Sequence, residues 1–141
     1  DAIALLVVGR CGPLGADVEL LRPMDDALAL AERHYVGDEI ARVAAARGAV
    51  RESAFFTCWT RKEAVLKSTG VGLSVAPCTV HVGATPEARE LRFVSTGGEV
   101  PLRLQSLRVR EGALGACATA PGVRIRGCFD WVDSVRAGLG R

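Results

Sequence analysis

The stretch Phe55–Leu73, FFTCWTRKEAVLKSTGVGL, decides how the rest of the chain is interpreted. Its apolar positions repeat at steps of three and four residues: Phe55, Cys58, Trp59, Leu66 and the stem of Lys62. This spacing is typical of a helix that buries one stripe of its surface. We therefore predict one long helix over Val50–Thr69, ended by Gly70.

The same stretch contains both lysines of the chain, Lys62 and Lys67, although the sequence has 18 Lys and Arg residues in all. Lysine is a compact point charge on a flexible stem, whereas arginine is a planar fork suited to bidentate partners. A site that needs a small cation close to one oxygen favours lysine. The restriction of lysine to this stretch therefore indicates a functional site. The bland alternative for Glu63 and Lys67 is a surface ion pair one turn apart, which is the commoner meaning of this spacing.

The whole chain has 141 residues, and we expect a single domain over residues 1–141. A net charge of +2, without a basic run, does not support a nucleic-acid partner. No apolar run reaches the length of a membrane span, so we expect no membrane partner either. Five widely spaced cysteines without a CxxC pair favour reduced thiols in a cytoplasmic protein.

Before the long helix, the apolar run 2–8 and the segment 16–20 flank a turn rich in Gly and Pro. This arrangement predicts a β-hairpin with a buried first strand. Two short helices follow over 24–35 and 37–48, with Asp38 as the N-cap of the second and Gly48 as its stop.

After the long helix, the hydrophobic period shifts toward two, which predicts strands over 78–82, 90–95, 101–110 and 113–120. The segment 124–141 is ambiguous between a strand and a helix. A hairpin, then helices, then several strands indicates an α+β fold, with an antiparallel sheet packed against the long helix.

Three carboxylates are candidates for chemistry. Asp17 and Glu19 are two apart on a predicted strand, so both point to one face. A hard divalent cation such as Mg²⁺ would neutralise their repulsion, whereas the bland alternative is a solvated strand edge. On the helix, Trp59, Glu63 and Lys67 share a face, and Glu63 at the rim of the apolar stripe is partly desolvated and needs a cation. His34 and His81 have no visible acid or nucleophile partner, and each is interpreted as a surface or structural histidine instead of a catalytic base.

Taken together, GADVE at 15–19, AERHYVGDE at 31–39 and the stretch Phe55–Leu73 resemble the 4′-phosphopantetheinyl transferases. That family has a (V/I)G(V/I)D(V/I)E-like strand, an R-F/Y-F helix end and the motif W-x-x-K-E-A-x-x-K-x-x-G-x-G-L. The last motif is matched by eight residues: Trp59, Lys62, Glu63, Ala64, Lys67, Gly70, Gly72 and Leu73. The three motifs lie in the expected order within Leu14–Leu73, about half of the chain.

The resemblance implies transfer of the phosphopantetheine arm of coenzyme A to a serine of an acyl or peptidyl carrier protein, with release of adenosine 3′,5′-bisphosphate. Such enzymes serve fatty-acid, polyketide and nonribosomal peptide synthesis. The resemblance also implies that Asp17, Glu19 and Glu63 surround Mg²⁺, and that Glu63 helps to deprotonate the serine. It implies that Lys67 neutralises the transferred phosphate, while Lys62 either assists at the phosphates or supports the helix.

The apolar run before GADVE resembles the C-terminal half of the larger, Sfp-type class, in which two similar halves form a pseudodimer. The resemblance then implies that the N-terminal half of the same protein, or self-association, completes the coenzyme A site. Ala16 departs from the branched residue usual in the strand motif. The rival interpretation is an inactive binding module that keeps the fold without the nucleotide-binding half.

Overall fold

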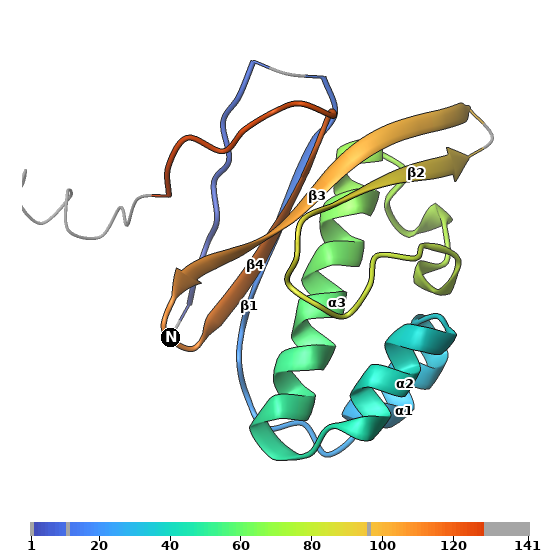
Figure 1. The fold of residues 1–141 in the computed structure, drawn as a ribbon, viewed down its shortest axis with the longest axis vertical. Coiled ribbons are helices and arrows are strands. Elements are labelled where there is room, and N and C mark those ends of the chain that lie inside the picture. Colours follow the sequence, from blue (N-terminus) through green and yellow to red (C-terminus); the bar gives the residue numbers. More distant parts are fainter. Residues whose placement is uncertain (1, 11, 96, 129–141) are drawn as a thin grey trace, which may run out of the picture.

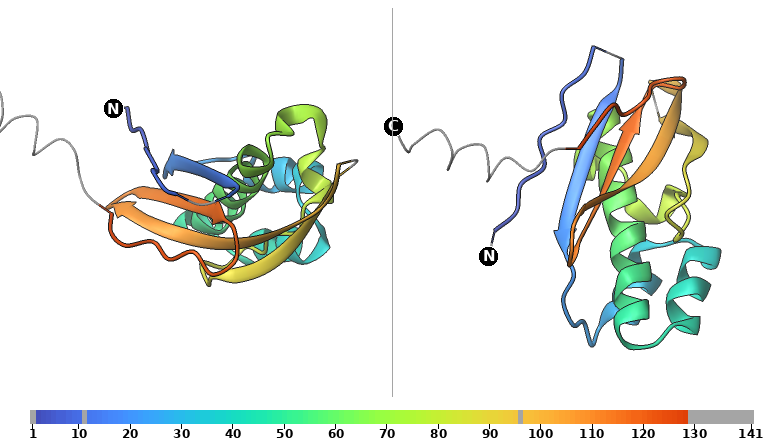
Figure 2. Two further views of the ribbon diagram at one scale, coloured as in Figure 1. Left: turned by 90° about the horizontal axis from the view of Figure 1, so that it is seen from above. Right: turned by 60° about the vertical axis from the view of Figure 1, so that its left-hand side comes forward.

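An antiparallel sheet packs on one side of a long central helix, and two short helices pack on the other side (Figure 1). This computed structural model describes residues 2–10, 12–95 and 97–128. Figure 2 shows the same layers from two further directions. The predicted α+β class, with an antiparallel sheet against a long helix, is confirmed.

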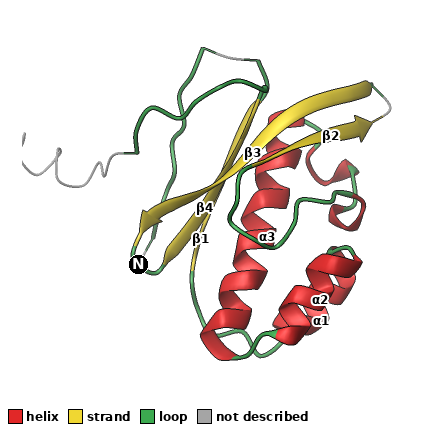
Figure 3. Ribbon diagram, in the orientation of Figure 1, coloured by secondary structure: helices red, strands yellow, loops and turns green. Residues whose placement is uncertain are grey.

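The sheet has four described strands in the order β1-β4-β3-β2, and each neighbouring pair is antiparallel. The strands are β1 (Leu14–Leu20), β2 (Arg89–Ser95), β3 (Gly98–Arg110) and β4 (Ala113–Thr119). The α-helices are α1 (Ala27–His34), α2 (Gly37–Ala45) and α3 (Gly48–Thr69), and Figure 3 separates them by colour from the strands. Two short 3₁₀ turns, η1 (Gly72–Ser74) and η2 (Pro77–Thr79), follow α3.

Helix α3 confirms the prediction of one long helix. It ends where expected, at Gly70, whose left-handed backbone (φ 70°) suits a residue without a Cβ. Between Ala54 and Leu66 nearly every side chain is buried, because the sheet covers one side of α3 and the short helices and loops cover another. Burial all round explains why charged residues of this helix also lie in the interior.

The contact between β1 and α3 depends on Gly15. A Cβ atom added there would lie 2.2 Å from the carbonyl oxygen of Ala64 and 2.3 Å from the amide nitrogen of Ser68. No side chain fits at that distance, so the glycine lets the strand lie directly on the helix. Because alternate residues of a strand share a face, Asp17 and Glu19 also point toward the α3 side.

The predicted N-terminal hairpin is wrong. Residues 2–10 have no regular secondary structure, and β1 pairs instead with β4, from Leu14 opposite Thr119 to Leu20 opposite Ala113. The first segment runs beside the sheet, on the side away from α3 (Figures 1 and 2), and the side chains of Leu6 and Val8 are 77% and 84% exposed. Adjacency in the sequence favoured a local partner, whereas the true partner of β1 comes from the end of the sheet.

The strands predicted over 90–95, 101–110 and 113–120 are confirmed as β2, β3 and β4. The strand predicted over 78–82 is wrong. Turn η2 occupies its first part, and the remainder contacts side chains of α2 and α3 instead of a strand. Its alternating pattern arises because Val80 and Val82 enter the core while His81 faces solvent.

Both short helices are confirmed, but their predicted ends are wrong. The N-cap of α2 is Val36, and the carboxylate of Glu39 accepts a hydrogen bond from its amide at 3.1 Å. Asp38 contacts His81 instead, with 2.8 Å between Oδ2 and Nε2. Helix α2 ends at Ala45, and Gly48 begins α3 with a left-handed backbone (φ 50°). In the ambiguous segment, residues 124–128 have no regular structure, and the remaining residues lie outside the described part of the chain.

Within the described ranges, none of the helices combines the length and the apolar character needed to cross a bilayer.

Candidate active site at the edge of the sheet

The candidate site lies where the edge strand β1 packs against the second half of α3. Asp17 and Glu19 come from β1, and Glu63 and Lys67 come from α3. The negative charges of Asp17 and Glu19 both act on Glu63 and raise its pKa. The fold therefore brings together the four residues that the sequence assigned to catalysis and to the metal.

The closest contact in the site joins the two elements. The Nζ atom of Lys67 lies 2.6 Å from Oδ1 of Asp17. The lysine side chain is 49% exposed, whereas that of the aspartate is only 13% exposed. The structure does not show the alternative of a surface pair between Glu63 and Lys67, because Lys67 donates its hydrogen bond to Asp17.

The second oxygen of Asp17, Oδ2, is buried and has no hydrogen-bond donor among the described residues. Burial raises the pKa of the Asp17 carboxyl above its ordinary value, and the neighbouring charge of Glu19 adds to this, although Lys67 opposes both. A buried carboxylate oxygen without a partner is costly. Asp17 is therefore an acid whose neutralisation by Lys67 alone is incomplete.

Glu63 is the second acid with a perturbed pKa. Partial burial raises its pKa first, and the charges of Asp17 and Glu19 raise it further, against the opposing effect of Lys67. This agrees with the partly desolvated position predicted for it at the rim of the apolar stripe. Perturbed carboxyl groups that share a site are a mark of functional sites, although ion-pair networks can produce them too.

Glu19, the third acid, is paired with a basic side chain of its own. Its Oε2 atom lies 3.0 Å from Nη1 of Arg22. In the part of the chain that the structure describes, no three His, Cys, Asp or Glu side chains are arranged closely enough to hold a metal ion. The carboxylates are thus near enough to repel one another, while Lys67 and Arg22 contact two of them.

Lys62 lies elsewhere. Its ammonium group is buried, 2.8 Å from Oε2 of Glu39, and it also donates to the carbonyl oxygens of Pro77 (2.9 Å) and Val80. All three of its N–H donors are thus used by these acceptors, and none is directed to Asp17, Glu19 or Glu63. Of the two roles left open for Lys62, its contacts support the structural one, support of the helix, rather than binding of phosphate.

The partner of Lys62, Glu39, was missed as a special residue. Burial alone would raise its pKa, but Lys62 and the backbone amides of Val36 and Val82 hold the pKa of Glu39 below its ordinary value. Its Oε1 atom accepts from the amides of Val82 (2.7 Å) and Gly83 (2.9 Å). Nothing in the spacing of the sequence separates this glutamate from the exposed acids around it.

Arg61 was also missed. Its buried guanidinium donates to the carbonyl oxygens of Val82 (3.0 Å) and Glu87 (3.1 Å) and to the hydroxyl of Ser106 (3.1 Å). Burial, followed by the like charge of Arg89, lowers its pKa to about 10. Arg61 and Lys62 therefore fasten the segment 77–87 to α3, which leaves Glu63 and Lys67 to face β1.

An open pocket adjoins the acids. Its walls combine apolar and aromatic side chains with three polar ones: Met24, Leu30, Phe55, Phe56, Trp59, Glu19, Arg22 and His34. Trp59, predicted to be buried, is only partly so and lies in the wall. His34, interpreted as isolated, lies edge-on to Trp59 with 5.9 Å between ring centroids. The pocket places apolar surface directly beside Glu19.

Comparisons with known proteins identify a family for this chain. Residues 13–117 match the model of a family described as the 4′-phosphopantetheinyl transferase superfamily. The chain is 40% identical over 70 residues to the 4′-phosphopantetheinyl transferase AcpT of Salmonella typhimurium, an alignment that covers 50% of this chain and 36% of that protein. It is 36% identical over 84 residues to the 4′-phosphopantetheinyl transferase HetI of Nostoc sp., covering 60% of this chain and 35% of HetI. A putative 4′-phosphopantetheinyl transferase of Synechocystis sp. is 36% identical over 63 residues, which cover 45% of this chain and 26% of that protein. The chain therefore matches between 26% and 36% of the length of these relatives.

Proposed function

The chain belongs to the 4′-phosphopantetheinyl transferase superfamily, and we propose that it supplies the catalytic groups for transfer of the 4′-phosphopantetheine arm of coenzyme A to a carrier-protein serine, with release of adenosine 3′,5′-bisphosphate. The observation that carries this proposal is the contact between the Lys67 ammonium and the buried carboxylate of Asp17, beside Glu63. Acids and a point cation at one place suit phosphoryl transfer, which depends on positioning and charge neutralisation more than on covalent help.

We infer a Mg²⁺ ion here from the chemistry of the donors, because the three carboxylates are not grouped as a ready set of ligands in the described part of the chain. Asp17 has a buried carboxylate oxygen without a donor, and Glu19 and Glu63 add further hard oxygen ligands at the same edge. Mg²⁺ prefers one or two protein carboxylates together with water and substrate phosphate. We infer that Asp17, Glu19 and Glu63 hold this ion, and that the ion, when bound, neutralises charge on the pyrophosphate of coenzyme A.

Glu63 is the group we assign to the attacking hydroxyl. Partial burial and the charges of Asp17 and Glu19 raise the pKa of Glu63, which makes its carboxylate a stronger base. In this role its carboxylate orients the serine hydroxyl of the carrier and accepts its proton. Lys67, whose side chain is half-exposed, can reach an incoming phosphate without leaving its helix, and its charge would stabilise the phosphoryl oxygens during transfer.

The carrier protein and the rest of the enzyme are also proposals. We infer that the open pocket beside Glu19 receives an apolar side chain of the carrier next to its serine, because its walls are mainly aromatic and aliphatic. We also propose that this chain acts as the C-terminal half of an Sfp-type pseudodimer. The exposed Leu6 and Val8 and the length of the matched relatives support a covering N-terminal half, or a second copy, that completes the coenzyme A site.

Carrier mass tests the proposal. The chain is incubated with coenzyme A, Mg²⁺ and an apo carrier, both alone and joined to the N-terminal half proposed above (the longer protein). Intact-protein mass spectrometry follows the carrier. We expect the longer protein to add the phosphopantetheine arm, and the variant Glu63→Gln to add none. An unmodified carrier with the longer protein, across carriers of fatty-acid, polyketide and peptide synthesis, would refute the proposed activity.

A further inference from the structure

Lys67 holds the acid that the proposed Mg²⁺ would need. Its ammonium lies 2.6 Å from Asp17, a carboxylate that is mostly buried, while the lysine itself is half-exposed. Without an ion, the carboxylates of Asp17, Glu19 and Glu63 repel one another. Lys67 is the cation that contacts Asp17, the most buried of the three. Lys67 thus neutralises part of the negative charge that the metal ion would neutralise.

We propose that Lys67 competes with the divalent cation for Asp17 and must release this carboxylate when the ion binds. The inference rests on the proposed function, because it takes the acids as the cation site. It adds that Lys67 has two successive partners: Asp17 in the ion-free protein, and an anionic group of the substrate once the ion has taken its place. The half-exposed side chain makes that exchange possible without movement of α3.

The proposal explains why the three carboxylates do not form a ready set of ligands. In the described part of the chain, no three acidic side chains are grouped closely enough for a metal ion, yet Oδ2 of Asp17 is buried without a donor. If Lys67 satisfies only one oxygen, the site stays partly unsatisfied. Exchange of Lys67 for an ion then has a modest energetic cost, because the lysine side of the ion pair is half-exposed and returns to solvent.

If Lys67 competes with the cation, its removal should change the cation affinity in the opposite direction to that expected for a lysine that supports binding. A lysine that merely helped to build the site would weaken cation binding when removed. A competing lysine does the opposite, because its removal frees Asp17 and also removes a nearby positive charge. We expect Lys67→Met to bind Mn²⁺ about three- to tenfold more tightly than the native chain.

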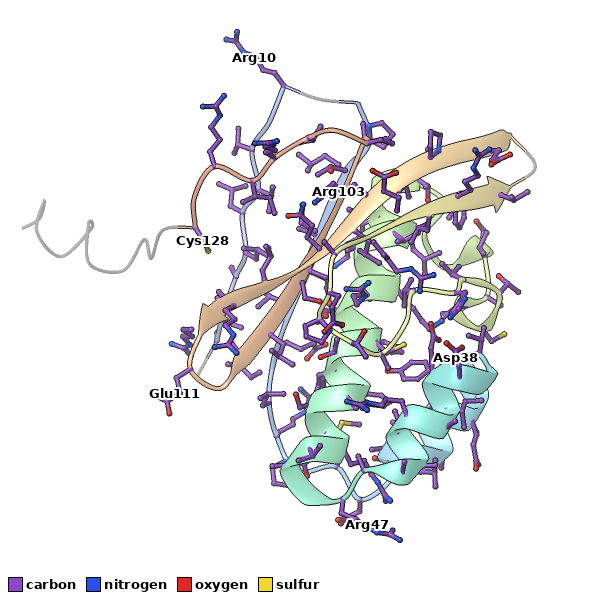
Figure 4. All side chains as sticks on the ribbon, in the orientation of Figure 1. Arg10, Asp38, Arg47, Arg103, Glu111 and Cys128 are labelled. Atoms are coloured by element: carbon purple, nitrogen blue, oxygen red, sulfur yellow. The ribbon has the colours of Figure 1, made fainter. Side chains whose placement is uncertain are left out.

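The control matches the change in charge. Arg47 is exposed and precedes α3 at its far end, about 30 Å from Lys67 at the rise of a helix, and Figure 4 shows its side chain pointing away from the sheet. Arg47→Met therefore removes one positive charge without touching the acids. Mn²⁺ suits carboxylate ligands, and its free form is measured directly by electron paramagnetic resonance during a titration. The native chain, Lys67→Met and Arg47→Met are compared in the same buffer.

A second readout uses the lysine content of the chain. With only two lysines, ¹³C-labelled lysine gives side-chain NMR signals from Lys62 and Lys67 alone, and the Lys67→Met variant assigns them. On addition of Mg²⁺ we expect the Lys67 signal to move as its ammonium leaves Asp17. The Lys62 signal should stay in place, because its ammonium is buried and is held by Glu39.

Tighter Mn²⁺ binding in Lys67→Met than in Arg47→Met, with a shift of the Lys67 signal alone, supports the competition. Equal or weaker binding in Lys67→Met, while the native chain binds Mn²⁺, overturns the competition and leaves the proposed transfer activity standing. Failure of all three proteins to bind Mn²⁺ overturns the competition together with the assignment of a cation to these acids, whereas the carrier-mass experiment tests transfer independently.

Discussion

The Nζ atom of Lys62 lies 2.8 Å from Oε2 of Glu39, and both side chains are almost completely shielded from solvent. This pair, with the carbonyl oxygens of Pro77 and Val80, ties α2, α3 and the segment 77–80 together. It also divides the work of the two lysines. Lys62 is a point cation inside the fold, and Lys67 is a point cation at the candidate site.

The two lysines should therefore respond differently to the same substitution. Lys62→Met leaves the buried carboxylate of Glu39 without its partner, and we expect a loss of about 3–5 kcal/mol in the free energy of unfolding. Lys67→Met removes a half-exposed pair and should cost no more than about 1 kcal/mol. Urea denaturation of both variants measures the difference, and adding Glu39→Gln to Lys62→Met should recover part of the loss. Similar small losses in both variants would mean that the buried pair is not an essential part of the fold.

Transfer activity should show the reverse order for Lys67. Its substitution by Ala in a protein that also contains the upstream half should depress the rate of pantetheinyl transfer far more than it depresses stability. The reason is that its charge acts on the phosphate, while the ion pair that it forms contributes little to folding. Carrier-mass kinetics measure the rate, and thermal unfolding provides the comparison. A normal rate in Lys67→Ala would leave this lysine with only a surface role.

Glu63→Gln should abolish transfer and stabilise the fold. Because the folded pKa of Glu63 lies above its ordinary value of 4.5, the native state binds this proton more tightly than the unfolded chain. Ionisation as the pH rises through the folded pKa therefore disfavours the fold, and stability from this group is lost upward in pH. Relative to pH 4, the melting temperature of Glu63→Gln should gain on the native chain as the pH rises toward 7. The exposed Glu32→Gln on α1 serves as control, and an equal gain there would contradict the assignment.

Gly15→Ala should disrupt the contact between β1 and α3. The added methyl would lie 2.2 Å from the carbonyl oxygen of Ala64, so strand or helix must shift. We expect a loss of about 3 kcal/mol in unfolding free energy, at the upper end for overpacked cores, and reduced transfer as Asp17 moves away from Lys67. Gly12→Ala is the matched control, since its nearest neighbour would be the Cβ of Ala120 at 3.9 Å. If both variants unfold at the same urea concentration, the close approach does not govern the position of the strand.

Leu30→Asp should affect the carrier protein rather than coenzyme A. Leu30 lines the open pocket beside Glu19, where an apolar side chain of the carrier is proposed to bind. A charge there should raise the apparent KM for carrier several-fold and leave the KM for coenzyme A unchanged. Ala41→Asp, on an exposed face of α2, is the control. Equal losses for both substrates would indicate a damaged fold, and an unchanged KM for carrier would place the docking surface elsewhere.

Local sequence patterns were sufficient to predict the elements that have a regular hydrophobic period along the chain. The long helix, its end at Gly70, the two short helices and the three C-terminal strands follow from periodicity and glycine positions. The candidate acids and Lys67 followed from spacing and from a motif of the family, because spacing on a strand or helix determines which residues share a face.

Only the tertiary structure decided the long-range partners. It pairs β1 with β4 instead of the preceding apolar run, and it pairs the ammonium of Lys62 with the carboxylate of Glu39. Positions 62 and 63 are both charged residues of the same motif. Successive residues of a helix are nevertheless about 100° apart around its axis. Lys62 therefore faces the interior, and Glu63 faces the acids of β1. Which side of α3 is covered by α2 and which meets the edge strand depends on contacts between residues far apart in the chain, and no local pattern records those contacts.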